Sequence, residues 1–429
     1  MRSLKWLMPG MRVKRWLFIL LAGVTFMALG IAYALIDLYQ GAAVPEAWQR
    51  GAEFLTLQVV PQWARAVLFA ALGLGLVLVG LVRLNQSLLG VVRRSGSGAL
   101  VDLVDRRRRG QSGPKIVAIG GGTGLSTLLR GLKEHTSTLT AIVTVADDGG
   151  SSGRLRRNLG IHPPGDFRQC IAALADTEPL MSSLFEYRFG RGELGGHAFG
   201  NLFIVAMTGI TGSFESALRA SSRVLAVRGR IVPSTLAHVT LSAELADARV
   251  LTGEHQVPTG DAPIRRVFLD PSAPAAYPEA VAAILGADLV VVGPGSLYTS
   301  VLPNLLVPDL AAAMAATSAR VAYVANVATQ PGETDGYSLD DHMAALGRHL
   351  PGDVFDAVLA NDNLAPDIPD SWGVAAVGPR LTSAARTGAT LVVADLVNAS
   401  RPTRHDPDKL AAAVVGIVQP EARRGRRAA

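Results

Sequence analysis

Short apolar runs alternate with helix-like stretches from residue 114 onward. The runs Lys115–Ile119 and Leu139–Val145 have the composition of buried strands, and leucines recur at helical spacing between Leu125 and Leu132. Because the runs are continuously apolar, they suit strands that are covered on both faces. The pattern predicts a doubly wound, mainly parallel, Rossmann-like α/β sheet. Later strand candidates are His238–Leu241, Val267–Asp270, Asp288–Val292, Arg320–Val327 and Val354–Ala360.

The segment Arg228–Pro263 has a different pattern. Val and Thr alternate there, with Gly253, Pro258 and Gly260 as turn residues. This composition predicts an antiparallel excursion rather than another strand-helix unit. In the parallel part, ligands bind beyond the carboxyl ends of the strands. The residues that directly follow each strand are therefore the candidates for function.

Two apolar segments precede this domain. Residues 17–36 contain no charge and residues 66–82 are entirely apolar, so each can cross a bilayer core of ~30 Å as a helix. Basic residues are frequent in 1–16 and in the linker 83–113, whereas the loop 37–65 holds only two. This charge distribution predicts a two-span protein of the cytoplasmic membrane, with both termini and the large domain in the cytoplasm. A cleaved signal peptide is the alternative for the first segment.

The formal net charge of +6 is unevenly distributed. Residues 1–113 carry +9 and residues 114–429 carry −3. Positive charge thus belongs to the membrane-proximal region and to an Arg-rich tail at 419–429, and nucleic-acid binding by the domain at 114–418 is not favoured. Cys170 is the single cysteine, so the chain has no intramolecular disulfide framework and no Cys-based metal site.

The first predicted strand runs into the turn Gly120-Gly121-Gly122-Thr123-Gly124. Neither register of these glycines puts a third glycine where the dinucleotide fingerprint requires it, and the Gly-Lys-Ser/Thr ending of a P-loop is missing. An NAD-dependent dehydrogenase is therefore disfavoured. What remains is a helix start with free backbone N–H groups, a site that suits phosphate. A structural tight turn is the alternative.

A second glycine-rich turn follows the second predicted strand: Asp147-Asp148-Gly149-Gly150-Ser151-Ser152-Gly153. In a Rossmann-type sheet an acid at this position often binds ribose hydroxyls. One carboxylate beside a phosphate loop could equally hold Mg²⁺. Asp147 and Asp148 point in different directions, so each has its own role, and ordinary turn acids are the alternative.

Two helix starts carry further candidates. Asp166 lies at the start of a helix-like stretch and either caps it or contacts a ligand, and Arg168 is the better ligand candidate. Asn201 begins an apolar helix, where it binds a ligand or acts as a cap. His197, in a glycine-rich setting just before it, has a structural role or a functional one.

The later strands end in polar residues as well. Gly295 and Ser296 follow one strand, Asn326 follows the next, and Asn361 ends a third. Together with the two glycine turns, these residues predict a polar rim at one edge of the sheet.

The motifs resemble those of the gluconeogenesis factor family (YvcK-like), which is related to the CofD-like 2-phospho-L-lactate transferases. The resemblance covers about residues 114–418. Typical members are cytoplasmic and lack a membrane hairpin, so this chain departs from the pattern in its tethering. The resemblance rests on 118–124, 147–153, 165–168, 293–300 and 326–334.

The resemblance implies a ligand and a set of contacts. Gluconeogenesis factors bind uridine diphosphate sugars such as UDP-N-acetylglucosamine and support cell-wall and cell-shape homeostasis on gluconeogenic carbon. By carry-over, the two glycine turns hold the diphosphate, Asn201, Ser296 and Asn326 line the same cleft, and Arg404 is a weaker diphosphate contact. The transferase relatives use a nucleoside diphosphate-activated donor with Mg²⁺, which Asp147 or Asp148 would hold here.

Two functions therefore follow from the sequence. The first is a membrane-tethered UDP-sugar-binding regulator without turnover. The second is a phospholactate-type transferase with Mg²⁺. No unambiguous general base is evident, which favours the regulator. A homo-oligomer is also expected, and partner proteins cannot be named from the residues.

Overall fold

The computed structural model describes residues 113–176, 179–365, 368–382 and 388–418, together with the single positions 24, 28 and 61. The chain divides into two compact units, Met1–Asp105 and Arg106–Ala429. The predicted membrane segments 17–36 and 66–82 and the tail 419–429 lie outside the described residues, except for Val24 and Ala28. Among the described residues, no single helix has both the length and the apolar character to cross a bilayer. The bent pair Leu297–Leu305 and Pro308–Ala316 has that length and composition when its two helices are counted together.

A seven-stranded sheet forms the centre of the large unit, with the strand order β10-β9-β8-β7-β1-β2-β3. All six pairings in it are parallel. The prediction of a mainly parallel α/β sheet is therefore confirmed. Its strands are β1 Ile116–Gly120, β2 Leu139–Val143, β3 Arg230–Pro233, β7 Leu289–Val292, β8 Arg320–Val324, β9 Ala357–Asn361 and β10 Thr390–Ala394.

The direction of winding reverses between β1 and β7. From β1 the chain adds β2 and then β3 on one side, and later it adds β7, β8, β9 and β10 on the other. The strands that follow β1 and β7 therefore lie on opposite sides, which makes the edge between β1 and β7 a topological switch point, where open α/β sheets bind their ligands. Both strands are fully buried, as continuous apolar runs require.

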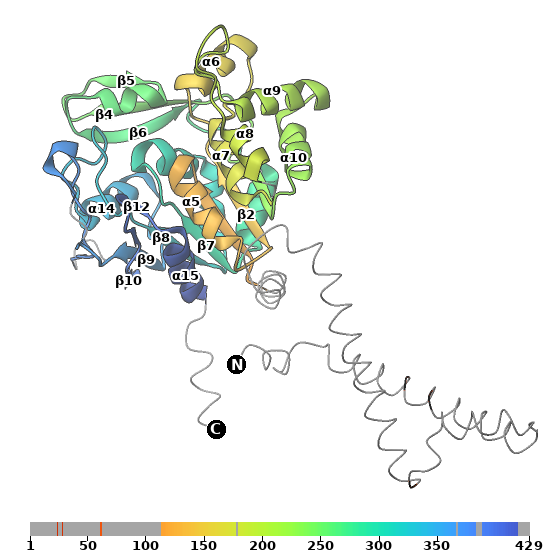
Figure 1. The fold of residues 1–429 in the computed structure, drawn as a ribbon. Coiled ribbons are helices and arrows are strands. Elements are labelled where there is room, and N and C mark those ends of the chain that lie inside the picture. Colours follow the sequence, from red (N-terminus) through yellow and green to blue (C-terminus); the bar gives the residue numbers. More distant parts are fainter. Residues whose placement is uncertain are drawn as a thin grey trace, which may run out of the picture. The chain divides into compact units, whose positions relative to one another are not determined.

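Helices surround this sheet (Figure 1). Helix α5 packs against α7 and the C-terminal helix α15, and α11 packs against α13. The helices are α5 Gly122–Leu132, α6 Gly150–Leu159, α7 Gly165–Leu174, α8 Pro179–Glu186, α9 Phe199–Thr211, α10 Phe214–Val224, α11 Pro278–Leu285, α12 Leu302–Leu305, α13 Pro308–Ala316, α14 Leu339–His349 and α15 Pro407–Val418. Short helical turns are η3 Glu254–Thr259, η4 Leu297–Val301 and η5 Asp370–Trp372.

A separate three-stranded antiparallel sheet contains β4 Thr240–Leu245, β5 Val250–Thr252 and β6 Ile264–Asp270. An antiparallel excursion was predicted for Arg228–Pro263, and the observed bounds differ at both ends. Strand β6, which contains the strand candidate Val267–Asp270, lies entirely after Pro263. The start of that segment, β3, pairs in parallel with β2 and belongs to the main sheet. A small hairpin of β11 Val397–Asn398 and β12 Arg401–His405 precedes α15.

Candidate functional site

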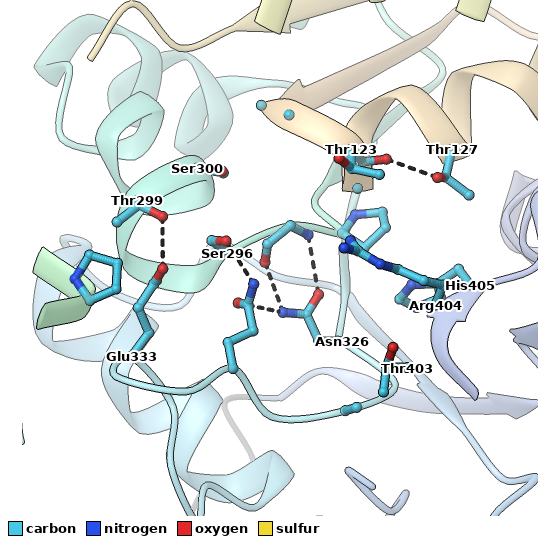
Figure 2. A pocket seen from close by; sticks show the side chains of 18 of the residues that line it. Thr123, Thr127, Ser296, Thr299, Ser300, Asn326, Glu333, Thr403, Arg404 and His405 are labelled. Carbon is cyan, nitrogen blue, oxygen red and sulfur yellow. Dashed lines mark hydrogen bonds between the residues drawn. The ribbon is translucent and has the colours of Figure 1, made fainter. Parts of the chain in front are cut away.

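A cavity of about 620 Å³ lies beyond the carboxyl ends of β2, β1, β7 and β8, across the switch point. Figure 2 shows side chains from α5, the turn after β7, the segment after β8 and β12 facing it. Its lining is mostly polar and glycine-rich, with Gly121, Gly122, Thr123, Gly124, Asp147, Asp166, Gln169, Glu254, Gly295, Ser296, Thr299, Asn326, Gln330, Glu333, Trp372 and Arg404 among the residues that contribute.

The turn between β1 and α5 brings backbone rather than side chains to the cavity. Gly121 is the N-cap of α5 and provides no side-chain cap, and Gly122 has φ +59°, which glycine adopts without strain. A Cβ on Gly124 would collide with the backbone of Pro294 and Gly295. The glycines therefore allow α5 to begin directly against the turn after β7.

Asn326 holds that second turn. Its Oδ1 accepts from the N–H of Gly295 at 3.2 Å, and its Nδ2 donates to the carbonyl of Gly295 at 2.9 Å (Figure 2). Its Nδ2 also donates to Gln330 Oε1 at 3.2 Å, and Gln330 Nε2 donates to Ser296 Oγ at 2.7 Å. This chain of amides links the segment after β8 to the segment after β7 and leaves the Ser296 hydroxyl proton available.

Glu333 fixes the start of η4 in the same way. Its carboxylate accepts from the Tyr298 N–H at 3.2 Å and from the Thr299 hydroxyl at 2.9 Å. Burial raises the pKa of Glu333, while these two donors act in the opposite direction. The Glu333 carboxylate therefore lines the cavity but is already hydrogen-bonded to Tyr298 and Thr299.

Arg404 is the one Lys or Arg side chain among the described residues that line the cavity. It projects from β12 and is exposed, so it can reach a bound anion. The end of β12 is held to the sheet by His405, whose Nε2 lies 3.2 Å from the carbonyl of Ala325. A cation opposite the N-terminus of α5 suits a diphosphate.

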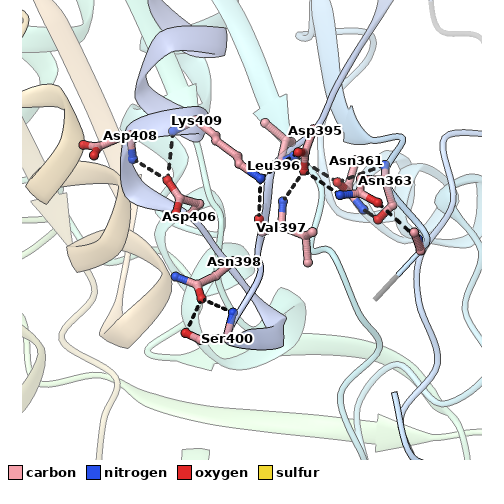
Figure 3. A network of polar contacts seen from close by, with 11 residues as sticks. Asn361, Asn363, Asp395, Leu396, Val397, Asn398, Ser400, Asp406, Asp408 and Lys409 are labelled. Carbon is pink, nitrogen blue, oxygen red and sulfur yellow. Dashed lines mark hydrogen bonds and ion pairs between the residues drawn. The ribbon is translucent and has the colours of Figure 1, made fainter. Parts of the chain in front are cut away.

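A polar network surrounds the β11–β12 hairpin, whose second strand carries Arg404 (Figure 3). Lys409 Nζ lies 2.6 Å from the Asp395 carboxylate and donates to the Val397 carbonyl at 3.1 Å. Asn361 Oδ1 accepts from the Leu396 N–H at 3.0 Å. The polar strand end at Asn361, expected to face a ligand, instead anchors the C-terminal segment.

Three acidic side chains, Asp147, Asp166 and Glu254, also line the cavity. Burial raises the pKa of Asp166 to about 7 and that of Glu254 to about 8, and Asp147 adds to both shifts by charge repulsion. Burial also raises the pKa of Asp147. The Asp166 carboxyl is not the helix cap considered from the sequence, since it lies in the first turn of α7 and accepts from the Gly122 N–H. Such raised pKa values are typical of functional sites.

The predicted site residues separate into two groups. Those that line the cavity are Gly121, Gly122, Thr123, Gly124, Asp147, Gly295, Ser296, Asn326 and Arg404. Those that do not line it are Gly120, Asp148, Gly149, Gly150, Ser151, Ser152, Arg168 and Asn201. Gly120 ends β1 beneath the cavity, where its carbonyl accepts from Asn304.

Three members of the second group, Ser151, Arg168 and Asn201, belong to a neighbouring polar network. Ser151 Oγ lies 2.9 Å from His197 Nδ1 and accepts from Asn201 Nδ2 at 2.9 Å. Asn201 Oδ1 in turn accepts from Arg168 Nε at 3.1 Å. These contacts join α6, α7 and α9 behind the second glycine turn. Asp148 pairs with His255, with 2.7 Å between Oδ1 and Nδ1.

Sequence reasoning missed several lining residues. Glu254, Gln330 and Trp372 all line the cavity and were not proposed as contacts. Glu254 follows Gly253, a turn glycine that was noted only as a break in the strand pattern. Trp372 lies outside every motif, and no local signal marked it.

Comparison with known proteins decides the family. Residues 116–371 match the profile of 2-phospho-L-lactate transferase CofD. The gluconeogenesis factor of Bacillus subtilis (strain 168) is 52% identical over 258 residues, which cover 60% of this chain and 80% of that protein. The gluconeogenesis factor of Listeria innocua is 40% identical, covering 71% and 96%. This chain belongs to the gluconeogenesis factor family.

The fold of this gluconeogenesis factor family member agrees with solved structures. A crystal structure of a UPF0052 family protein from Bacillus halodurans is 42% identical, with a TM-score of 0.67. That similarity covers 71% of this chain and 100% of the other. The sequence-based recognition of the family is therefore confirmed.

The carboxylates suit Mg²⁺ only with a ligand present. Among the described residues, no group of three or more His, Cys, Asp and Glu side chains is arranged to hold a metal ion. Mg²⁺ is commonly held by one or two carboxylates together with substrate phosphates and water. Asp147 lines the cavity and would be the protein's ligand, whereas Asp148 is occupied by His255.

Proposed function

We propose that this gluconeogenesis factor family member binds a uridine diphosphate sugar, UDP-N-acetylglucosamine, and acts as a regulator of cell-wall and cell-shape homeostasis during gluconeogenic growth. The observation that carries the proposal is the convergence on one cavity of the α5 N-terminus, the Gly295–Ser296 turn and the Arg404 guanidinium. A diphosphate needs backbone donors, a helix N-terminus and a cation. All three face the same space.

The size and polarity of the cavity support the same ligand class. At about 620 Å³ it has the volume typical of a site for a small molecule of this kind. The arrangement does not suit NAD through the usual fingerprint, because no third glycine follows Gly122 at the required spacing.

Calorimetric titration of the full-length protein with UDP-N-acetylglucosamine, GDP and NAD tests the proposal. We expect the uridine sugar to bind most tightly. Tighter binding of GDP would favour the transferase instead, and absence of heat with the uridine sugar would remove the proposed function. The regulatory part predicts that a strain without the protein loses normal cell shape on gluconeogenic carbon and keeps it on glucose.

A second candidate is a transferase of the CofD type, and the raised pKa values of Asp166 and Glu254 favour it. A group with a pKa near 7 can accept a proton from an attacking hydroxyl. The hydroxyl oxygen would bond to the donor's phosphorus, the bond from phosphorus to the nucleoside monophosphate would break, and the proton would pass to the carboxylate. Mg²⁺, when bound, would neutralise phosphate charge. Nucleoside monophosphate release in the presence of a phospholactate-type donor and a deazaflavin acceptor would identify this reaction.

The membrane tether also remains a proposal. Segments 17–36 and 66–82 and their basic flanks would hold the nucleotide-binding unit at the cytoplasmic face. Membrane fractionation of cells, compared with a variant that begins at residue 106, tests this. The full chain should sediment with membranes at high salt and the shortened one should not.

A further inference from the structure

The cavity changes its chemistry along the edge of the sheet. The strands beneath it follow one another in the order β2, β1, β7 and β8. Since neighbouring strands lie roughly 4.8 Å apart, about 14 Å separate the end of β2 from the end of β8. Asp147 follows β2 and Asn326 follows β8, so these residues mark the two ends.

The β2 end is acidic. Asp147, Asp166 and Glu254 line it, and Asp166 also accepts from the Gly122 N–H at the start of α5. Gln169 adds a polar amide, and its Oε1 accepts from the Thr123 hydroxyl at 3.2 Å. No Lys or Arg among the described residues lines this end, so no cation in the cavity wall would balance the charge of a phosphate group here.

The β8 end combines the polar side chains of Asn326, Thr329 and Gln330 with an apolar surface, which contains the one aromatic ring of Trp, Tyr or Phe among the described lining residues. Val327, Ala328, Val374 and Trp372 contribute to it. The indole of Trp372 is 52% exposed and thus free to accept a partner on its surface.

That wall is fixed in place by backbone pairing. The segment after η5 runs alongside the segment after β8, where the Thr329 N–H donates to the Ala375 carbonyl at 2.8 Å and the Val377 N–H donates to the Val327 carbonyl at 2.9 Å. Thr329 Oγ1 also accepts from the Ala375 N–H at 2.9 Å. Trp372 and Val374 are therefore carried by a strip that is anchored to the sheet.

We propose that the ligand lies along the edge of the sheet from β8 to β2. Its nucleobase then lies against Trp372 and Val374, and its N-acetylglucosamine sugar lies toward Glu254 and Asp166. The diphosphate then occupies the middle, between Arg404 and the Thr123 and Gly124 N–H groups at the start of α5, since Asp166 already accepts from the Gly122 N–H. This orientation rests on the proposed function and adds the residues that select each end of the ligand. A planar base gains from stacking on an indole, and sugar hydroxyls can donate to carboxyl oxygens.

The reverse orientation lacks a suitable wall. A base at the β2 end would face carboxyl groups, with no aromatic ring among the described lining residues to stack on. The sugar would then lie against Val327, Ala328 and Val374, and the nearby amides of Asn326 and Gln330 are already bonded to Gly295 and Ser296.

Titrations of the full-length protein with two probes, UDP and UDP-N-acetylglucosamine, separate the two orientations. Trp372→Ala should weaken both ligands by the same factor, about tenfold for one lost stacking contact, and Trp372→Phe should restore most of the affinity. Glu254→Ala, which removes both carboxyl oxygens, should weaken UDP-N-acetylglucosamine while UDP binds as tightly as before or more tightly. Thr259→Ala, on the same turn η3 but outside the cavity lining, is the control and should change neither.

The outcomes are distinct. If the wild type binds both probes but Trp372→Ala affects only the sugar nucleotide, or Glu254→Ala weakens both equally, the orientation is overturned and the proposed function stands. If the wild type binds neither probe, the proposed function fails, and the orientation fails with it.

Discussion

The side-chain amide of Asn326 makes two hydrogen bonds with the backbone of Gly295. Its Oδ1 accepts from the Gly295 N–H at 3.2 Å, and its Nδ2 donates to the Gly295 carbonyl at 2.9 Å. The residue at the end of one strand thereby sets the backbone at the end of the neighbouring strand. Some of the polar residues expected to contact the ligand therefore have a structural role. The Asn326 side chain positions the backbone of Gly295, which lines the cavity.

Replacing Asn326 with Ala should release this turn. Two backbone groups of Gly295 lose their partners, at a cost of about 1–3 kcal/mol in the free energy of unfolding. Affinity for the uridine sugar should fall as well, because Ser296 and Gly295 line the cavity. Thermal unfolding and titration of the same preparation measure both effects. Unchanged affinity would show that the turn does not contact the ligand.

Gly124 is predicted to be intolerant of a single methyl group. Its Cβ would collide with the backbone of Pro294 and Gly295, which cannot yield as a flexible side chain would. Gly124→Ala should therefore destabilise the fold by about 1–3 kcal/mol and weaken ligand binding. Gly347→Ala is the matched control, since a Cβ there meets nothing within 4 Å on helix α14. Equal melting temperatures for the two variants would contradict this account of the packing.

Stability should depend on pH through Glu254. The folded protein keeps a proton there up to about pH 8, because burial and the neighbouring Asp147 raise the pKa from 4.5. The unfolded chain releases that proton near pH 4.5, so this contribution is complete below pH 4.5 and is lost by about pH 8.

Glu254→Gln cannot ionise, so the variant should not lose stability through this group as the pH rises. The variant should melt at least about 2 °C above the wild type at pH 8.5 and at the same temperature near pH 4.5. Melting curves across this range, with the exposed Glu193→Gln as a control, give the comparison. A variant that is less stable than the wild type at pH 8.5 would mean that the carboxylate has a stabilising partner.

Substitution of Asn201 tests whether this residue stabilises the fold or contacts the ligand. It bonds Ser151 and Arg168 and does not line the cavity, so Asn201→Ala should lower the melting temperature while changing ligand affinity little. The lost pair of buried hydrogen bonds costs about 1–3 kcal/mol. A large loss of affinity at an unchanged melting temperature would instead place Asn201 on the ligand, as its position at a helix start suggested.

The sheet could be read from the sequence because its signals are local. Continuous apolar runs such as Leu289–Val292 and glycine turns such as Gly120–Gly124 carry their meaning within a few residues. The role of Arg230–Pro233 could not be read this way, since a short strand does not reveal which sheet it joins.

The site was predicted in part for the same reason. The glycines and acids after β1 and β2 could be predicted because they directly follow strands. Glu254 and Trp372 reach the cavity from segments that are distant in the sequence. Asn201 was ambiguous because its partners Ser151 and Arg168 are 50 and 33 residues away. Such partners become visible only once the chain is folded.

The central claim, that this cavity binds the diphosphate of a uridine sugar, is tested most directly at Arg404. Calorimetric titration with UDP-N-acetylglucosamine compares the wild type with Arg404→Ala and with Arg401→Ala, an exposed arginine on the same strand β12 that does not line the cavity. Loss of charge-assisted hydrogen bonds should weaken binding by about tenfold or more in Arg404→Ala, with wild-type affinity in Arg401→Ala. Equal affinity in all three proteins would contradict the account.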